Sequence, residues 1–309
     1  MTGLLVLDEA ATLAALDPRR LMAAVADALV AVAQDRASAP PRSAAFTPHG
    51  LLGAMPGYVP GQGLAAKLVT VFADPTHPGR STHRGIVALF DPEDGRPLAV
   101  MDAEPITAWR TAASATHSAL ALARPGPVVV VGTGMQARAQ VGLLAVLRPD
   151  EPVTVVGRDP DAARATAALH PAGRAADGIE KAVRQAATVY CCTGATTPVL
   201  RRAWLAPGTH VSSVGGSQGH ELDAATVQDA TLYAEWPGAA ATPPPSGAHE
   251  LQGLPPDRTV TLLGAVLDGS APGRRTPDEL TVYKSTGHAV LDVAAAYVVH
   301  SAVTGRSAG

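Results

Sequence analysis

Aromatic residues and cysteines are scarce in this chain of 309 residues. Phe, Tyr and Trp make up 4% of it, and the only two cysteines are the adjacent Cys191 and Cys192. Neighbouring cysteines inside the apolar run TVYCCTG are expected to be buried thiols, which excludes a disulfide-stapled fold and predicts a cytoplasmic location. A chain of this length buries a core large enough to fold without disulfides.

Long hydrophobic runs and an excess of one charge are also missing. The most apolar helical stretch, residues 21 to 33, is interrupted by Asp27 and is too short to span a bilayer, and no signal peptide is expected. The 24 Lys and Arg residues against 27 Asp and Glu give a formal charge of −3, with the arginines scattered along the chain. We therefore expect neither a membrane nor a nucleic acid as partner, but a small molecule.

The hydrophobic pattern changes along the chain. Residues 8 to 36 carry apolar side chains at helical spacing, and Asp17 and Pro18 mark the start of the second helix. Residues 42 to 102 show short apolar runs separated by turn residues, which predicts an antiparallel meander with the hairpin turn DPEDG. A helix is predicted over residues 106 to 123.

The second half alternates strand and helix patterns. From residue 124 this alternation predicts a parallel sheet with right-handed crossovers. Residues 236 to 258 are rich in proline and glycine and are expected to form a surface loop. The segment from 281 to 303 begins as a strand pattern and continues as an apolar helix.

A glycine-rich loop joins a strand to a helix in this second half. The sequence GTGMQA fits G-x-G-x-x-A, directly after the valines 128 to 131 and before a helical pattern. Gly132 permits the tight turn, Gly134 lets the backbone approach a pyrophosphate, and the helix start at Met135 and Gln136 supplies N–H donors. The loop predicts a dinucleotide cofactor; a turn without a ligand is the alternative.

The end of the next strand bears on which dinucleotide binds. NAD-binding proteins usually place an acidic residue about 20 residues after the loop to accept from the ribose 2′-OH. Here Gly157 is followed by Arg158, which can pair with a 2′-phosphate. NADP(H) is favoured over NAD(H). The alternative is that Asp159 binds the ribose and Arg158 is a solvated charge.

Several longer motifs resemble the ornithine cyclodeaminase and mu-crystallin family, which includes cyclic ketimine reductases and archaeal alanine dehydrogenase. They are LAAKLVTVF, THRGIVALFDPEDGRPLAVMDA, ITAWRTAA, VVGTGMQA, CCTGATTPVL, PGTHVSSVGGSQGHELD and TVYKSTGHAVLDVAAA. The resemblance implies an α/β fold: a Rossmann-type doubly wound parallel sheet over residues 124–284 that binds NAD(P), plus a split α+β substrate-binding and dimerisation domain. That domain is expected over residues 1–123, completed by 285–309. The resemblance also implies a homodimer.

Three cations lie in otherwise apolar or small surroundings: Arg42, Lys67 and Arg110. A lysine within a strand-like apolar run is costly, so Lys67 either lies at an exposed strand edge or is aimed at an anion. The resemblance implies that these three residues hold the carboxylate of an amino or imino acid, that Arg110 also lies near the cofactor, and that Lys67 is a candidate proton donor.

The resemblance further implies a set of residues that line the cofactor pocket, each of which is otherwise a strand-end hydroxyl or a core residue. They are Thr82, Thr111, Thr193, Val214 and Ser285. Thr193 and Ser285 are the strongest candidates, because each stands beside a glycine-containing turn at the carboxyl end of a strand, where open α/β sheets bind ligands.

One departure from the family bears on the reaction. Cyclodeaminases use an aspartate in a stretch that resembles VGGSQGHEL, where this chain has Ser217. A serine hydroxyl cannot replace a carboxylate base. His220 and His83 are alternative proton-transfer residues, or else solvated loop histidines.

The departure favours a reductase over a cyclodeaminase. The predicted reaction is NAD(P)H-dependent reduction of Δ1-pyrroline-2-carboxylate or Δ1-piperideine-2-carboxylate to a cyclic amino acid. Ornithine cyclodeamination, open-chain amino acid dehydrogenation and non-catalytic ligand binding of the crystallin type remain alternatives. The ten histidines form no metal-ligand pattern, so no metal is expected.

Overall fold

The computed structural model describes residues 3 to 73, 81 to 215 and 219 to 305, without the side chains of residues 73 and 81 to 83. It divides the chain into two units, Met1–Arg110 with His288–Gly309 (unit 1) and Thr111–Gly287 (unit 2). The sequence placed these boundaries at residues 123 and 285. The first boundary of the structure falls inside helix α3 (Ala103–Leu122), whose start belongs to unit 1 and whose remainder belongs to unit 2.

Two capped helices open unit 1. In α1 (Glu9–Ala15) and α2 (Pro18–Ala33), an aspartate before the helix accepts a hydrogen bond from a first-turn backbone N–H. For α2 this residue is Asp17, whose Oδ1 accepts from the Arg20 nitrogen at 2.7 Å. The predicted start of the second helix is therefore confirmed.

The meander is confirmed as well. Unit 1 contains a six-stranded sheet in the order β1-β6-β5-β4-β3-β2, in which β2 to β6 are antiparallel and β1 adds to the edge in parallel. The DPEDG turn joins β5 to β6, with the Asp91 nitrogen bonded to the Arg96 oxygen at 2.9 Å. The strands are β1 (Leu5–Leu7), β2 (Ser43–Thr47), β3 (Gly50–Val59), β4 (Gly63–Ala73), β5 (Ser81–Phe90) and β6 (Pro97–Asp102).

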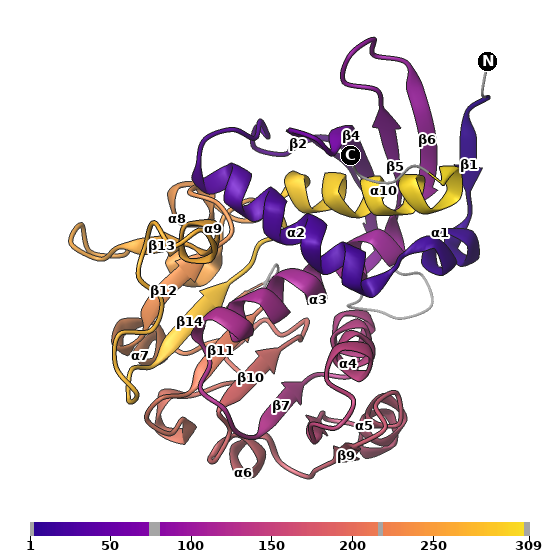
Figure 1. Ribbon diagram of the computed structural model, residues 1–309. Helices are drawn as coiled ribbons and strands as arrows, with labels where there is room; N and C mark the ends of the chain where they lie inside the picture. The colour runs from indigo at the N-terminus through magenta and orange to yellow at the C-terminus, as the bar shows by residue number, and fades with distance from the viewer. Residues whose placement is uncertain (1–2, 74–80, 216–218, 306–309) are drawn as a thin grey trace. The chain divides into compact units, whose positions relative to one another are not determined.

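The C-terminal helix covers one face of this sheet. Helix α10 (Ala289–Thr304) is apolar on all sides and packs between the sheet and α2 (Figure 1). At Gly57, a β-carbon would lie 3.1 Å from the β-carbon of Ala289, so the glycine permits the close approach of β3 and α10. The opposite face keeps large apolar side chains exposed, among them Leu52, Leu64 and Ile86.

Unit 2 is built around an eight-stranded parallel sheet in the order β13-β12-β14-β11-β10-β7-β8-β9. The chain runs outward from β7 through β8 and β9, then returns to the other side of β7 with β10. This reversal makes the sheet doubly wound, as predicted, and the place where the strand order reverses is where such sheets bind ligands.

The strands of unit 2 are β7 (Val128–Val131), β8 (Val153–Val156), β9 (Gly173–Ala175), β10 (Thr188–Cys191), β11 (His210–Ser213), β12 (Thr231–Ala234), β13 (Val260–Leu262) and β14 (Thr281–Lys284). Its helices are α4 (Met135–Leu147), α5 (Pro160–Ala167), α6 (Ile179–Val183), α7 (Ala224–Asp229), α8 (Gly238–Ala241) and α9 (Leu263–Leu267), with short 3-10 turns η1 (Arg202–Trp204) and η2 (His249–Leu251).

The prediction of a surface loop at residues 236 to 258 is only partly confirmed, because residues 252 to 257 are largely exposed but other parts of the segment are buried. The segment contains α8 and η2. It buries Trp236, Glu250 and Leu251. Most prolines of the segment are exposed, whereas Gly238 and Gly247 are buried. Glu250 is buried where it meets the buried Lys284 of β14.

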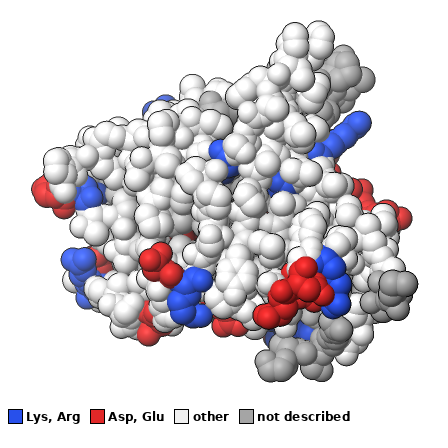
Figure 2. Space-filling model, turned by 90° about the horizontal axis from the view of Figure 1, so that it is seen from above, with Lys and Arg blue, Asp and Glu red and all other residues white. Residues whose placement is uncertain are grey.

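Charged side chains lie in small mixed groups between broad uncharged areas on the face that Figure 2 shows. Among the described residues, no helix is both long and apolar enough to cross a membrane.

Candidate functional site

The glycine loop after β7 has the geometry of an anion cradle. Gly132 has a φ of +123°, and a β-carbon there would lie 2.4 Å from the carbonyl oxygen of Cys192, so only glycine fits. At Gly134, by contrast, no atom lies within 4 Å of the place of a β-carbon. A ligand can therefore approach the backbone at the start of α4.

The first turn of α4 is open to ligands and its base is packed. Gly134 and Met135 are exposed, while Ala137 is fully buried against the core that contains Val130 and Tyr190. The small side chain of Ala137, at the last position of the glycine motif, thus lets the helix pack close to the sheet. The free N–H groups of the first turn face an open space. Gln136 belongs to the same turn and is half-buried.

The end of β8 lacks an acidic side chain for a geometric reason. A β-carbon at Gly157 would lie 2.6 Å from the Thr133 methyl carbon in the glycine loop. The following Arg158 is exposed, and no hydrogen bond or ion pair ties it to the described part of the chain. Asp159 caps α5, because its Oδ1 accepts from the nitrogens of Asp161 at 2.9 Å and Ala162 at 3.3 Å.

A buried carboxylate organises the carboxyl ends of β10 and β11. Glu221 accepts from the backbone nitrogen and hydroxyl of Thr193 at 2.7 and 2.6 Å through Oε1. Its Oε2 accepts from the Ser213 hydroxyl at 2.7 Å and the Gly215 nitrogen at 3.0 Å. Glu221 therefore fixes Thr193, one of the predicted cofactor residues, while Val214 packs partly buried against the neighbouring core.

A lysine and a second carboxylate join Glu221. Lys284 Nζ donates to the Ser213 hydroxyl at 2.8 Å, the Gly215 oxygen at 2.9 Å and Glu250 Oε1 at 3.1 Å. It also lies 3.9 Å from Glu221 Oε2. We call Glu221, Glu250 and Lys284 the acidic triad; its members are almost completely buried.

A further buried acid holds the turn after β14. Glu235 Oε1 accepts from the backbone nitrogens of Thr286 and Gly287 at 2.7 and 2.8 Å, and from the Ser285 hydroxyl at 3.2 Å. Ser285, predicted to line the cofactor pocket, is thus fixed at the carboxyl end of a strand.

The cations of unit 1 gather around a carboxylate that the sequence reasoning missed. Lys67 Nζ, on β4, lies 3.0 Å from Oδ1 and 2.9 Å from Oδ2 of Asp292 on α10. Arg110 Nε, on α3, donates to Asp292 Oδ1 at 3.0 Å. Lys67 is 4% exposed and Arg110 3%, which rules out an exposed strand edge for Lys67.

Burial and charge set the protonation of this cation cluster, which comprises Arg42, Lys67, Arg110 and Asp292. Burial lowers the pKa of Lys67 to about 8 against the opposing charge of Asp292, and Arg110 and Arg42 lower it further. Burial alone would raise the pKa of Asp292, but Arg110 and Lys67 hold it below its ordinary value. The half-buried Arg42 therefore acts electrostatically on the same cluster.

A histidine lies beside the cation cluster. Burial lowers the pKa of His288 to about 4, partly offset by Asp292, so the imidazole is neutral at physiological pH. The residue precedes α10 as its N-cap. Like Asp292, it had no assigned role from the sequence.

The remaining predicted site residues belong to neither cluster, and some lie outside the described part of the chain. Ser217 lies outside the described residues, and so do the side chains of Thr82 and His83, whose backbone belongs to β5. His220 is exposed, with its ring 5.7 Å from that of His249. Thr111 is buried at the start of unit 2.

The sequence does contain a signal for two residues that were not predicted, Asp292 and Lys284. Asp292 stands in AVLDVAAAYVV and Lys284 ends the strand TVYK, so each is a charge inside an apolar run. The same argument singled out Lys67. A buried charge needs a partner, so each of these three charges indicates a buried ion pair.

The fold is similar to that of solved enzyme structures. A sequence model of the ornithine cyclodeaminase/mu-crystallin family matches residues 5–307. The chain belongs to the ornithine cyclodeaminase/mu-crystallin family.

Named relatives include two reductases and a dehydrogenase. The ketimine reductase mu-crystallin of Mus musculus is 33% identical over 82% of this chain and 80% of the mouse protein. The structure of Thermococcus litoralis Δ1-pyrroline-2-carboxylate reductase in complex with NADH and L-proline aligns with a TM-score of 0.82 and 25% identity, covering 98% of both chains. An archaeal alanine dehydrogenase dimer with bound NAD aligns with a TM-score of 0.83 and 27% identity, covering 98% of this chain and 96% of that one.

Proposed function

We propose that this protein reduces a small cyclic imino acid, of the Δ1-pyrroline-2-carboxylate or Δ1-piperideine-2-carboxylate type, with NAD(P)H. The observation that carries the proposal is the surplus positive charge of the cation cluster. Lys67 and Arg110 share a single carboxylate, Asp292, and the charge of Arg42 acts on Lys67 as well. The buried Nη1 of Arg110 has no hydrogen-bond acceptor among the described residues.

A substrate carboxylate would complete the cation cluster. A buried guanidinium nitrogen without an acceptor is costly, and a carboxylate oxygen is the acceptor that matches its planar geometry. Asp292 supplies one negative charge for the two cations that it contacts, Lys67 and Arg110, and a ligand with one carboxylate would supply the second. Asp292 holds Lys67 and Arg110 in place, which prepares them for the ligand.

Lys67 suits the proton transfer that the reaction requires. Reduction of the ring C=N bond adds a hydride to the carbon and a proton to the nitrogen. With a pKa lowered to about 8, the ammonium group is protonated near neutral pH yet gives up its proton more readily than an ordinary lysine. Lys67 is the proposed proton donor.

The cofactor is proposed to bind at the glycine loop of unit 2. The crowded Gly132, the open space at Gly134 and the exposed start of α4 fit a pyrophosphate. NAD(P)H, when bound, supplies the hydride. The two family structures named above contain NADH and NAD, so either cofactor is consistent with the family.

We further propose a preference for NADPH. Asp159 is engaged in capping α5, whereas Arg158 is exposed and available to a 2′-phosphate. The variant Arg158→Gln should weaken NADPH about tenfold and leave NADH nearly unchanged, because a charge-assisted hydrogen bond contributes about 1.5–3 kcal/mol. Equal loss for both cofactors in a fluorescence titration would contradict this preference.

A homodimer is proposed through the uncovered face of the unit 1 sheet. Leu52, Leu64 and Ile86 remain exposed there, and Leu68 pairs with Ile86 across β4 and β5. The archaeal alanine dehydrogenase was solved as a dimer. Ile86→Lys should give a monomer in light scattering, while Leu120→Lys, at an exposed position of α3, should not.

Turnover with defined substrates tests the function. Purified protein is given each of the two cyclic imines with NADPH or NADH, and cofactor oxidation is followed between about pH 5 and 9. We expect consumption with at least one imine. No consumption with either imine at any of these pH values would refute the reductase.

Open-chain substrates are the second candidate, favoured by the similarity to alanine dehydrogenase over nearly the whole chain. Pyruvate with ammonia is the matching test. Faster cofactor oxidation with pyruvate and ammonia than with either imine would replace the cyclic substrate by an open-chain one and keep the role of the cation cluster.

A further inference from the structure

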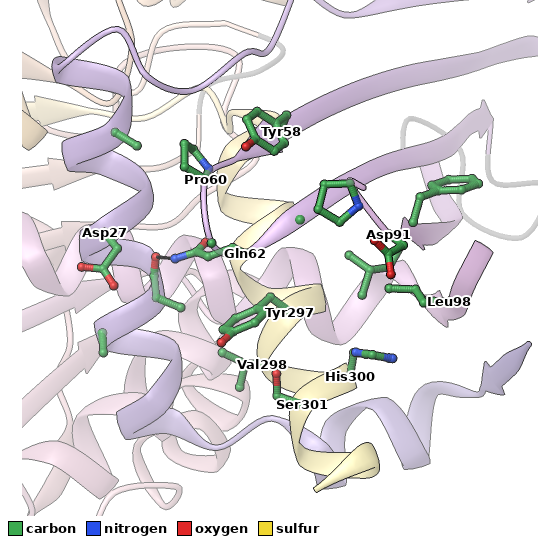
Figure 3. Close-up of a pocket in the computed structure, with 18 of the residues that line it drawn as sticks. Asp27, Tyr58, Pro60, Gln62, Asp91, Leu98, Tyr297, Val298, His300 and Ser301 are labelled. Atoms are coloured by element: carbon green, nitrogen blue, oxygen red, sulfur yellow. Dashed lines mark hydrogen bonds between the residues drawn. The ribbon is translucent and has the colours of Figure 1, made fainter. Parts of the chain in front are cut away.

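A hollow of about 800 Å³ lies at one end of the unit 1 sheet (Figure 3). Its lining includes three acidic residues and two arginines, but one of the acids, Asp91, pairs with Arg96 outside the hollow at 2.9 Å. Gln62, which also lines it, donates to the carbonyl oxygen of Ala24 at 2.8 Å. The charges of the hollow are therefore balanced, in contrast to the end of β8, where Arg158 has no ion pair with the described residues.

The end of β8 is held beside the glycine loop by the backbone. Val131 lies opposite Val156 in the parallel register of β7 and β8, and the Gly132 nitrogen donates to the Val156 oxygen at 2.9 Å. Thr133 and Gly157, which follow in the two segments, are thereby brought together. A larger side chain at either position is expected to affect the other.

The Thr133 side chain fills the space beside Gly157. A β-carbon at Gly157 would lie 2.6 Å from the Thr133 methyl carbon but 3.7 Å from the Thr133 β-carbon. The first distance is too short for two carbon atoms, whereas the second is an ordinary contact. Gly157 has no positive φ, so its backbone conformation would accept another residue. Among the described atoms, only the methyl group of Thr133 is too close.

Threonine cannot move its methyl group away freely. Its β-carbon carries a methyl group, a hydroxyl group and a hydrogen, and χ1 has three staggered positions. Of the two other positions, one places the hydroxyl oxygen where the methyl group now lies, and only the other places the hydrogen there. An acidic side chain at residue 157 would therefore force Thr133 into one particular rotamer or displace the glycine loop.

The end of β8 is also where a fold of this type distinguishes the two dinucleotides. An acid at this place accepts from the ribose 2′-OH of NAD, and its negative charge would repel a 2′-phosphate. In this chain Gly157 lacks the acid, and the neighbouring Arg158 is exposed. Exclusion of the acid therefore favours the phosphorylated cofactor.

We propose that Thr133 determines which cofactor binds. Its methyl group occupies the space that a carboxylate side chain at residue 157 needs, and so leaves the ribose end of the site to Arg158 and a 2′-phosphate. This role rests on the proposed binding of NAD(P)H at the glycine loop. It requires the two positions to act together: an acid at residue 157 improves NADH binding only where Thr133 is also made smaller.

Fluorescence titrations with NADPH and NADH test this cooperation in four proteins: the wild type, Thr133→Ala, Gly157→Asp and the double variant. Gly157→Asp should weaken NADPH about tenfold or more and should not bind NADH more tightly than the wild type does. The double variant should bind NADH about fivefold or more tightly than Gly157→Asp does. Thr133→Ala lacks the acid and should not gain NADH affinity. Equal NADH affinity of Gly157→Asp and the double variant would overturn the proposal.

The matched control is Thr276→Ala, at an exposed threonine of unit 2. Combined with Gly157→Asp, it should leave the NADH affinity at the value of Gly157→Asp alone. A gain in NADH affinity equal to the gain from Thr133→Ala would show that the effect does not come from Thr133, and would overturn its role.

The steric contact is tested without a cofactor. Gly157→Ala adds only the β-carbon, so it should lower the urea midpoint of unfolding in the wild type. In the Thr133→Ala background, where the methyl group is absent, the same change should leave the midpoint unchanged or raise it. An equal decrease in both backgrounds would overturn the contact, even where Gly157→Asp fails to fold.

The two levels of the proposal fail in different ways. A wild type that binds neither NADPH nor NADH would refute the proposed cofactor site, and the role of Thr133 with it. A wild type that prefers NADPH, with no gain in NADH affinity in the double variant, would refute only the role of Thr133.

Discussion

Each of the two units buries a charged cluster, and the two clusters differ in the sign of their net charge. In the cation cluster of unit 1, Lys67 and Arg110 contact Asp292, and the charge of Arg42 acts on Lys67. The acidic triad of unit 2 has two carboxylates around Lys284. One cluster has too few acceptors for its donors, and the other has a surplus negative charge.

The two clusters also differ in the hydrogen-bond partners of their charged groups. Glu221 fills both its oxygens with bonds from Thr193, Ser213 and Gly215, so the chain itself compensates the negative charge. Arg110 keeps a buried Nη1 without an acceptor. The acidic triad also keeps a buried atom, Glu250 Oε2, without a partner among the described residues, but its Glu221 is satisfied by the chain itself. We propose that Arg110 Nη1 is instead completed by a ligand.

The largest expected effect is a loss of imine turnover when the lysine of the cation cluster is replaced. Lys67→Met should lower turnover of the imine by about 10²–10⁴, because it removes the proposed proton donor. Affinity for NADPH, measured by fluorescence titration, should change little. The control Lys181→Met removes an exposed lysine of α6 and should keep full turnover. Full turnover in Lys67→Met would remove this residue from the chemistry.

Removal of the lysine of the acidic triad should lower stability. Lys284→Met leaves Glu221 and Glu250 buried without their lysine, and breaking a buried ion pair costs about 3–5 kcal/mol. The free energy of unfolding, measured in urea, should fall by that amount. An unchanged unfolding midpoint with lost turnover would mean that the acidic triad, too, serves a ligand.

A conservative change sharpens the role of Arg110. Arg110→Lys keeps the charge but loses the planar pair of donors, so the KM for the imine should rise about tenfold or more. The KM for NADPH should stay within about twofold. A fall in kcat with an unchanged imine KM would place Arg110 in the chemical step instead of in carboxylate binding.

The smallest expected effect is on the pH profile. Since the pKa of Lys67 is lowered to about 8 by burial, the donor is protonated below that pH and loses its proton above it. Turnover at saturating imine should therefore be level below about pH 8 and fall about tenfold per unit above it. A profile that stays level to about pH 10 would point to another proton donor.

The sequence predicted the architecture well because its signals are local. Valine runs, the glycine loop and the Asp17 cap each act within a few residues, and the structure confirms the meander and the doubly wound sheet. Membership of the family was also readable from motifs spread over the whole chain.

The charge partners were missed because they are distant in sequence. Asp292 lies 225 residues from Lys67 and 182 from Arg110. Glu250 was placed in a surface loop because composition gives no information on a partner 34 residues away, Lys284. Local patterns identify an unpaired charge, but only the fold shows what it meets.

The central claim, that the cation cluster is charged to receive a carboxylate, is tested most directly by one calorimetric comparison. L-Proline and L-prolinamide differ only in the carboxylate, and each is titrated into the protein with NADPH present, so that no oxidation takes place. We predict that L-proline binds at least about tenfold more tightly, because charge-assisted hydrogen bonds to Arg110 and Lys67 are lost with the amide. Equal affinity for the two compounds would contradict the account.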